Sequence, residues 1–488
     1  MKHQQLFPNY INIIIYLFSA SLFAYFLDYS MLDDGLRHIA FATHPQQMRT
    51  WGEIFPHSLF FDYDPWYVWH KFIATLHSIV PFEYLHSVIN AITLFLLMIL
   101  IEKYLIKYVH YNMSSLIFIL VFSLLLMTSI RYLYVRPDQL SGLFVMSALL
   151  LNRNKFLPIF ILTLLYAPTY YLFFMYTGSI GLVHLVQQNK KAFLGVFLGS
   201  LFGGFFFLIQ DASAYFQTIT YILTDQSLRQ GLEVGEGKPL FSILSLLPYS
   251  IIMPLFFIII SFIIYKYYNY FKENSLALFL LITSLLWLNQ VRYYSLFMPL
   301  IFIYIFSLVS MLRLNTVLYI LRKYFVLGYK AFHDAKNNIL FYGIAIPYAI
   351  FMIALKFQDG STNEILSQSS YFSNEKFNNK TILLSKLDLD LYIGLYNNPT
   401  IKFVPSCSIG WFDDSNRTMK DIYIRMQEDD GVSEEELSSL LDFVKADYYM
   451  HHTTHPNQIL DMKKLSDLGI TPKYIINDRI LFYHDKNL

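Results

Sequence analysis

The chain has 488 residues, of which 55% are hydrophobic, 18% aromatic and 15% charged, and its mean hydropathy is +0.42. This composition excludes disordered, fibrous and ordinary soluble proteins and indicates an integral membrane protein. The formal net charge of +1 hides an asymmetry, because 23 basic and 15 acidic residues lie at or before residue 358 and 13 basic and 20 acidic residues lie after it. We therefore expect two domains, 1–357 in the membrane and 358–488 outside it.

Apolar runs predict about eleven membrane-spanning helices before residue 357, because a helix needs roughly 20 mostly apolar residues to cross the bilayer core. The first run, Tyr10 to Leu27, has no small-residue cleavage site before Asp28, so we interpret it as a retained span rather than a cleaved signal. The expected spans are 10–27, 84–102, 113–130, 139–151, 157–175, 178–187, 192–210, 240–265, 275–290, 294–312 and 338–356.

The short loops between these runs predict the orientation of the chain. Lysine and arginine collect in alternate loops, and such loops are typically cytoplasmic. The loop 28–83, the loop 211–239 and the tail should then face the extracytoplasmic side. The basic loops are those of Lys103 and Lys107, Arg153 and Lys155, Lys190 and Lys191, Lys266 and Lys272, and Arg313 to Lys336.

An acidic pair, Asp33-Asp34, follows the first span and is succeeded by Arg37 and an apolar run that indicates the start of a surface helix. Two adjacent carboxylates offer a general base or a cation ligand. If the segment is helical, Arg37 lies one turn beyond the pair. The alternative is that these acids complement the dipole at the start of a helix.

The same loop continues with Asp62, Asp64 and His70, which are interleaved with tyrosine and tryptophan. Acids provide acceptors for the hydroxyls of a sugar, and aromatic rings stack on its C–H faces. The alternative is an aromatic anchor at the membrane interface with a turn at Pro65.

Arginines lie at two further span ends that we assign to the extracytoplasmic side. Arg131 and Arg136 lie between two spans, and Arg292, followed by Tyr293, starts a late span. These positions run against the expected sidedness of basic residues, and guanidinium groups are suited to phosphate. The alternative is that the arginines pair with Asp138 or with acids of the loops.

The tail alternates strand-like and helix-like segments, which predicts a small α/β domain. Ser433 with Glu436 is expected to form a capping box at the start of a helix. Cys407 is the single cysteine, which excludes an intramolecular disulfide, and the tail has no basic tract for a nucleic acid. We interpret the histidine-rich tract 451–455 as a solvated loop, with a metal-binding tract as the alternative. The expected strands are 381–385, 400–404 and 480–483, and the expected helix is 433–444.

The layout resembles the C-class (GT-C) polytopic glycosyltransferases, which include the aminoarabinose transferase of lipid A and the protein O-mannosyltransferases. The resemblance is carried by Asp33-Asp34 with Arg37-His38, by the run Arg136 to Leu140, by Arg292-Tyr293 with Pro299, and by an external C-terminal domain. It implies a GT-C-like helical membrane domain and a polyprenyl-phosphate-linked sugar as donor. The acceptor would be a lipid, a glycan or a protein, and the localisation a bacterial inner membrane.

An inverting transfer needs a base for the acceptor hydroxyl and cations to hold the departing phosphate. We expect Asp33 as the base, Asp34 as its partner, and Arg136 and Arg292 at the phosphate. The sequence identifies no certain cofactor, and both aspartates could instead bind a divalent metal. The competing interpretations are a transporter or lipid flippase, or a polysaccharide polymerase or ligase. Transporters usually show repeated halves, and this sequence has no evident repeat.

Overall fold

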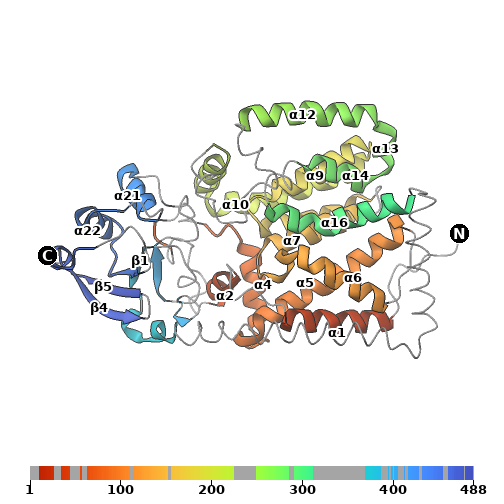
Figure 1. Ribbon diagram of the computed structural model, residues 1–488. Coiled ribbons are helices and arrows are strands. Elements are labelled where there is room, and N and C mark those ends of the chain that lie inside the picture. Colours follow the sequence, from red (N-terminus) through yellow and green to blue (C-terminus); the bar gives the residue numbers. More distant parts are fainter. Residues whose placement is uncertain are drawn as a thin grey trace.

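The computed structural model is predominantly helical and ends in a small mixed β-sheet (Figure 1). It describes residues 10–26, 35–43, 55–57, 63–109, 115–151, 155–224, 249–284, 291–311, 369–385, 394, 397–398, 400–404, 412, 416–427, 431–453, 460–476 and 479–486. The expected span 338–356 and residues 225–239 of the expected second external loop lie outside the described residues.

A helix forms at each expected span that falls within the described residues. These helices are α1 (Tyr10–Phe26), α5 (Phe82–Tyr104), α6 (Ser115–Thr128), α7 (Asp138–Leu150), α8 (Phe156–Tyr166), α9 (Phe173–Val186), α10 (Lys190–Thr224), α12 (Tyr249–Lys266), α14 (Ser275–Ile282) and α16 (Val291–Met311). Shorter elements connect them, namely α2 (Gly35–Thr43), α4 (Tyr67–His77), η2 (Leu105–Val109), η3 (Ile130–Leu133), η4 (Ala167–Thr169) and α13 (Tyr268–Glu273).

Two helix boundaries and the burial of one helix differ from those expected. The run 157–175 is divided, because Pro168 lies in the short helix η4 and α9 starts at Phe173. Proline has no N–H to continue the hydrogen-bond ladder of α8. Helix α10 continues past residue 210 to Thr224 and is interrupted at Asp211, whose φ and ψ are −160° and 103°. Helix α2 forms as expected but is no surface helix, since His38, Ile39 and Ala40 are buried.

Helices α8 and α10 pack closely through a row of glycines spaced four residues apart. A Cβ atom built on Gly195, Gly199 or Gly203 would lie 2.9, 2.8 or 2.9 Å from a carbonyl oxygen of α8. The two backbones therefore approach at distances that only glycine permits. Small residues in this spacing are typical of helix pairs in membranes.

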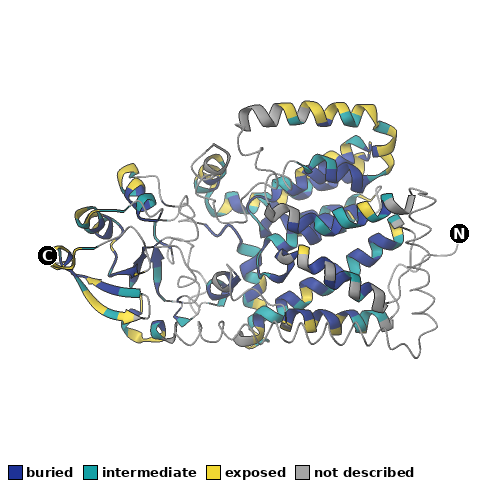
Figure 2. Cartoon of the chain, viewed as in Figure 1, coloured by how far each residue is buried: buried dark blue, intermediate teal, exposed yellow. Residues whose placement is uncertain are grey.

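Large apolar side chains point away from the helical part on α10 and α12. Ile209 and Phe262 are 70% and 64% exposed, and α12 lies at the edge of the helical part, where it contacts α13 and α14 (Figure 2). By length and hydropathy, two helices in the described part of the chain are candidate membrane spans, Tyr84–Tyr108 and Lys190–Thr220. Shorter apolar helices add Asn12–Tyr25, Asp138–Leu150, Phe156–Thr169, Phe173–Val186 and Ser295–Leu308.

The C-terminal region forms, within its described residues, a five-stranded sheet of order β2-β1-β3-β5-β4. Strands β1 and β2 are parallel, β3 runs parallel to β1, and β5 is antiparallel to β3 and β4. This confirms the predicted mixture of strands and helices. Its elements are η6 (Ser369–Ser373), η7 (Glu375–Phe377), β1 (Thr381–Leu384), β2 (Lys402–Val404), α21 (Arg417–Gln427), α22 (Glu434–Phe443), β3 (Tyr448–His452), α23 (Met462–Asp467), β4 (Ile470–Ile476) and β5 (Arg479–His484).

Alternate residues of each strand reach the two faces of this sheet. On one face Leu383 and Tyr449 share an apolar core with Leu440 of α22. On the other face Ile382 and Met450 belong to a core that also includes residues of the helical part. Both faces are therefore covered, which explains the wholly buried strands β1 and β3.

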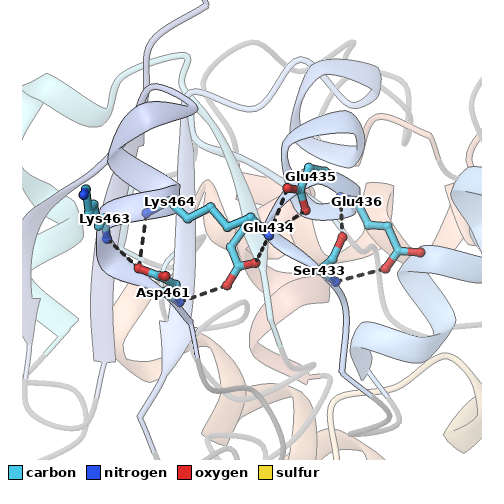
Figure 3. A network of polar contacts seen from close by, with 7 residues as sticks. All are labelled: Ser433, Glu434, Glu435, Glu436, Asp461, Lys463 and Lys464. Carbon is cyan, nitrogen blue, oxygen red and sulfur yellow. Dashed lines mark hydrogen bonds and ion pairs between the residues drawn. The ribbon is translucent and has the colours of Figure 1, made fainter.

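The start of α22 is held by the predicted capping box. The Ser433 hydroxyl accepts from the N–H of Glu436, and the Glu436 carboxylate accepts from the N–H of Ser433. Lys464 of α23 contacts Glu434 and Glu435 (Figure 3). The bond from Lys464 lowers the pKa of Glu435, and these contacts join the starts of α22 and α23.

The histidine-rich tract is not a solvated loop where the structure describes it. His451 and His452 are 6% and 3% exposed and lie in β3, between β1 and β5. An alternation of apolar and polar residues marks a strand that has only one buried face. Both faces of β3 are buried, so its sequence lacks this alternation and the strand was not predicted. Strand β4 and helices α21 and α23 were also missed.

Candidate functional site

Residues 63–66, just before α4, are held between two distant parts of the chain. The N–H of Asp64 donates to Oε1 of Gln210 over 3.2 Å, next to the interruption of α10 at Asp211. The carbonyl of Pro65 accepts from the N–H of Tyr171 over 3.1 Å, at the start of α9. The interruption of α10 thus lies beside the segment that carries Asp64.

Asp64, His70 and His38 form a continuous buried chain of polar contacts. Asp64 Oδ2 lies 2.7 Å from Nδ1 of His70, and Nε2 of His70 lies 2.8 Å from Nδ1 of His38. The other carboxylate oxygen of Asp64 accepts from the N–H of Trp66 over 2.9 Å. The three residues are 8%, 4% and 1% exposed.

Aromatic rings surround this chain. The Trp66 ring meets the His38 ring edge-on at 4.9 Å between centroids, and Phe41 lies 4.4 Å from His70. Helices α2 and α4, which supply the two histidines, pack on each other. Trp66 is buried and contacts the rings of both histidines. Tyr63 is also buried, and its burial raises the pKa of its hydroxyl.

A second polar group lies at η3 and the start of α7, where Arg131 forms an ion pair with Asp138. Their side chains are 5% and 15% exposed. The backbone N–H of Arg131 donates to Oγ of Ser295 in α16 over 3.3 Å, and Tyr132 donates to the carbonyl of Leu296 over 2.9 Å. We gave two interpretations for Arg131, a phosphate ligand and a partner of Asp138. The structure shows the pairing with Asp138.

Helix α5 connects the two groups. Asn90 of α5 donates to the carbonyl of Leu133 in η3 and accepts from Nε2 of Gln139 in α7. Helices α2 and α4 contact α5 as well. The helices that carry the two histidines and the segment around the Arg131 pair therefore contact the same helix.

For the remaining predicted site residues, the structure shows one side-chain contact, the helix to which the residue belongs, or no described position. The guanidinium of Arg136 lies over the Tyr134 ring at 5.5 Å. Arg37 belongs to α2, and Arg292 and Tyr293 belong to α16, where Arg292 comes one turn before Ser295. The acidic pair Asp33-Asp34 and Asp62 lie outside the described residues.

The segment between α2 and α4 also contacts the C-terminal domain. The His57 ring lies 4.9 Å from the ring of Phe443 in α22 and stacks at 6.0 Å on Phe412. In Figure 1 α2 and α4 lie at the end of the helical part that faces the sheet. The end that carries the Asp64 chain is therefore the end covered by the tail.

His38 is the member of this constellation that sequence reasoning did not include among the site residues. It was quoted only beside Arg37, and nothing local marks it as a partner of His70, which is 32 residues away. Among the described residues no group of three histidine, cysteine, aspartate or glutamate side chains could hold a metal ion. The proposed metal ligands Asp33 and Asp34 are not among those residues.

No protein-family model matches the chain, and no curated protein matches it significantly.

Proposed function

We propose that this protein is an integral-membrane glycosyltransferase that moves a sugar from a polyprenyl-phosphate donor to an extracytoplasmic acceptor by inversion. The observation that carries the proposal is the buried chain Asp64, His70 and His38 at the end of the helices beneath the tail. A chain of this kind moves or stores a proton, and sugar transfer to a hydroxyl releases one. Structural packing alone does not require two imidazoles and a carboxylate in contact.

The proposal includes membrane crossing by the helices in a GT-C-like arrangement of about eleven spans. The outward apolar side chains of α10 and α12 and the glycine row between α8 and α10 support it. The active site and the tail would then lie on the extracytoplasmic side of a bacterial inner membrane. The tail would cover the site.

The proposed roles follow the chemistry of each residue. The acidic pair Asp33-Asp34 binds the acceptor or a divalent cation or supplies the base, and Asp62 contributes acceptors for sugar hydroxyls. Arg37, Arg136 and Arg292, with Tyr293, hold the donor phosphate as charge builds on it. The guanidinium of Arg131 is paired with Asp138, so we assign Arg131 an indirect role. It would hold η3 in position beside the donor phosphate.

The proposal is tested by transfer from a panel of radiolabelled undecaprenyl-phosphate sugars to crude envelope acceptors, with purified wild type and an Asp33→Asn variant. We expect the wild type to release the labelled sugar from one of the donor lipids, and the Asp33→Asn variant to release it more slowly. Parallel reactions with a chelator decide whether a metal is needed.

No release from any donor would overturn the proposal. If wild-type proteoliposomes then carried a labelled lipid or solute across the membrane, the transporter interpretation would replace it. If Asp33→Asn and Asp34→Asn each kept full activity, the proposed transferase activity would be retained, but the proposed role of the acidic pair would be rejected.

A further inference from the structure

Glu102, near the end of α5, is buried against α1. Its side chain is 8% exposed, and the two helices pack on each other. Oε1 of Glu102 accepts a hydrogen bond from the Tyr16 hydroxyl over 3.0 Å and one from Nδ2 of Asn12 over 3.5 Å. The two donors lie one turn apart on α1, so they reach the same carboxyl oxygen. Glu102 therefore connects α5 to α1 through a single oxygen atom.

The other carboxyl oxygen, Oε2, is buried and has no hydrogen-bond partner among the described residues. No lysine or arginine in the described part of the chain forms an ion pair with Glu102, although Lys103, the next residue, acts on it electrostatically. Asp138, by contrast, is paired with Arg131. Within the described structure, Glu102 is thus a buried carboxyl group that lacks a cationic partner.

Apolar groups surround this carboxyl group. The Tyr16 ring lies 5.0 Å from the Phe118 ring of α6, and Met98, one turn before Glu102, is wholly buried. In such surroundings an ionised carboxylate loses the hydration that stabilises it in water, and two neutral donors do not replace that hydration. The protonated form has no net charge, so its burial costs much less. The geometry therefore favours the neutral acid.

We infer that Glu102 is a proton-binding site that holds α1 on α5: it keeps its proton at neutral pH, and loss of the proton at alkaline pH releases α1. In the neutral acid, Oε1 is the carbonyl oxygen that accepts from Tyr16 and Asn12, and Oε2 carries the proton. At alkaline pH, hydroxide takes this proton, which leaves a carboxylate and a water molecule. Because the carboxylate needs contact with water, the two helices must separate around it.

Other titratable or charged side chains occur on α5 and on the elements packed against it. Beyond Lys103, the nearest in sequence are Tyr104 and Lys107, which each donate to a carbonyl group of α7. Helix α6, which packs on α1, contains none. The others are Tyr10 and Tyr25 on α1, Arg37 and His38 on α2, Tyr67, His70, Lys71 and His77 on α4, Glu83, Tyr84 and His86 on α5, Tyr108 on η2, Arg131 and Tyr132 on η3, Asp138 on α7, and Arg292, Tyr293, Tyr294 and Tyr304 on α16.

The first test compares the stability of wild type and Glu102→Gln by chemical unfolding in detergent at about pH 5, 7 and 9. Glutamine has the shape of the neutral acid and cannot ionise. The unfolded wild-type chain releases the Glu102 proton above the ordinary glutamate pKa of about 4.3, whereas the folded protein keeps it, so wild-type stability falls as the pH rises. The folded-to-unfolded ratio of wild type should therefore fall by up to roughly tenfold per pH unit relative to that of Glu102→Gln.

An ionised Glu102 would give the opposite sign. Its charge would strengthen the bond from Tyr16, so Glu102→Gln would be less stable than wild type at pH 7, and this result would overturn the inference. Glu273→Gln, at an exposed position of α13, is the matched control. Its stability relative to wild type should not change with pH.

Tyr16→Phe is the second variant if Glu102→Gln does not fold. It removes one donor and leaves the carboxyl group in place. If Glu102 is neutral throughout, the loss of stability relative to wild type should be the same at pH 5 and at pH 7. A loss that grows with pH would show that Tyr16 stabilises a carboxylate, and it would overturn the inference.

Infrared spectra detect the proton directly, because a protonated carboxyl group and a carboxylate absorb at different frequencies. At pH 7 the wild-type spectrum should contain a carboxylic acid band that is absent from Glu102→Gln and retained in Glu273→Gln. Identical wild-type and Glu102→Gln spectra in this region would overturn the inference.

Hydrogen exchange tests the release of α1. At the alkaline pH where the band disappears, the amides of α1 should exchange faster in wild type than in Glu102→Gln, and those of α8 should exchange equally in both. Equal exchange of α1, or a band that persists until the whole protein unfolds, would overturn the role of the proton in holding α1. None of these measurements uses a sugar donor, so their outcome is independent of the proposed transferase activity.

Discussion

Three buried or partly buried carboxylates among the described residues are held by specific cationic, imidazole or N–H partners. Asp138 is paired with Arg131, Asp64 with His70, and Asp447 with the start of β1 and the end of the chain. Such charges are tolerated in a buried position only when they are paired and hydrogen-bonded. Removing one partner therefore has a different effect from removing both, which gives the first prediction.

For the ion pair of Arg131 and Asp138, we expect Arg131→Gln and Asp138→Asn each to lower the free energy of unfolding by about 3 kcal/mol, because each leaves a buried charge without its partner. The double variant should lose less than the sum of the two. Chemical unfolding in detergent measures all four proteins. Strictly additive losses would show that the pair contributes no coupling.

Asp447 gives a prediction about pH. Burial alone would raise its pKa, but the N–H of Thr381 and the ammonium groups of Lys486 and Lys380 hold the pKa of Asp447 below its ordinary value. A lowered folded pKa means that the stabilisation is present above the ordinary value of about 4 and is lost as the pH falls toward the lower folded value.

Asp447→Asn should therefore destabilise the C-terminal sheet by about 1–2 kcal/mol at pH 7 and by much less at the acid end of this range. Hydrogen exchange of the amides of β1 and β3, variant against wild type at each pH, measures the difference. Asp421→Asn, at an exposed position of α21, is the control and should change exchange little. An Asp447→Asn effect equal at both pH values would contradict the assignment.

Among the elements, the pair α8 and α10 depends most on a single residue type. Gly195, Gly199 and Gly203 allow the backbones to meet, whereas the opposite side of α10 carries large apolar groups such as Phe205 and Ile209. The helix thus has one face for a neighbouring helix and one that suits lipid. Its interruption at Asp211 lies next to Gln210, which accepts a hydrogen bond from Asp64. Helix α10 therefore contacts both α8 and the segment that carries Asp64.

We expect Gly199→Ala to destabilise the protein by about 1–3 kcal/mol, because the new Cβ would lie 2.7 Å from Cβ of Thr163 and 2.8 Å from the carbonyl of Phe160. Gly178→Ala in α9 is the matched control, since nothing lies within 4 Å of its added Cβ. The control should be neutral or slightly stabilising through helix propensity. Thermal unfolding compares the two variants, and equal effects would contradict close packing.

For the whole molecule, the arrangement places the C-terminal sheet at one end of the helices (Figure 1). His57 connects the first loop to the tail through Phe412 and Phe443. The proposed sidedness rests on the sequence, because lysine and arginine collect in alternate loops between the apolar runs and such loops are typically cytoplasmic. One labelling experiment tests this arrangement.

In a Cys407→Ala background, a Lys463→Cys variant carries its thiol in the exposed start of α23, and a Lys190→Cys variant carries it in the exposed start of α10. A membrane-impermeant maleimide applied to intact cells should label Lys463→Cys and not Lys190→Cys. After the membrane is permeabilised, both should react. Labelling of both variants in intact cells, or of Lys190→Cys alone, would contradict the proposed orientation.

The sequence alone determined most helices of the first part, because long apolar runs are a strong local signal, and it determined the α22 cap, because Ser433 and Glu436 are three residues apart. Strand β3 was not predicted from the sequence. Its neighbouring strands, and the residues that cover its two faces, come from distant parts of the chain. The candidate site divides in the same way. Asp64 and His70 stand out in one short polar and aromatic segment, but only the packing of α2 on α4 brings His38 to His70, since a contact across 32 residues has no local signature.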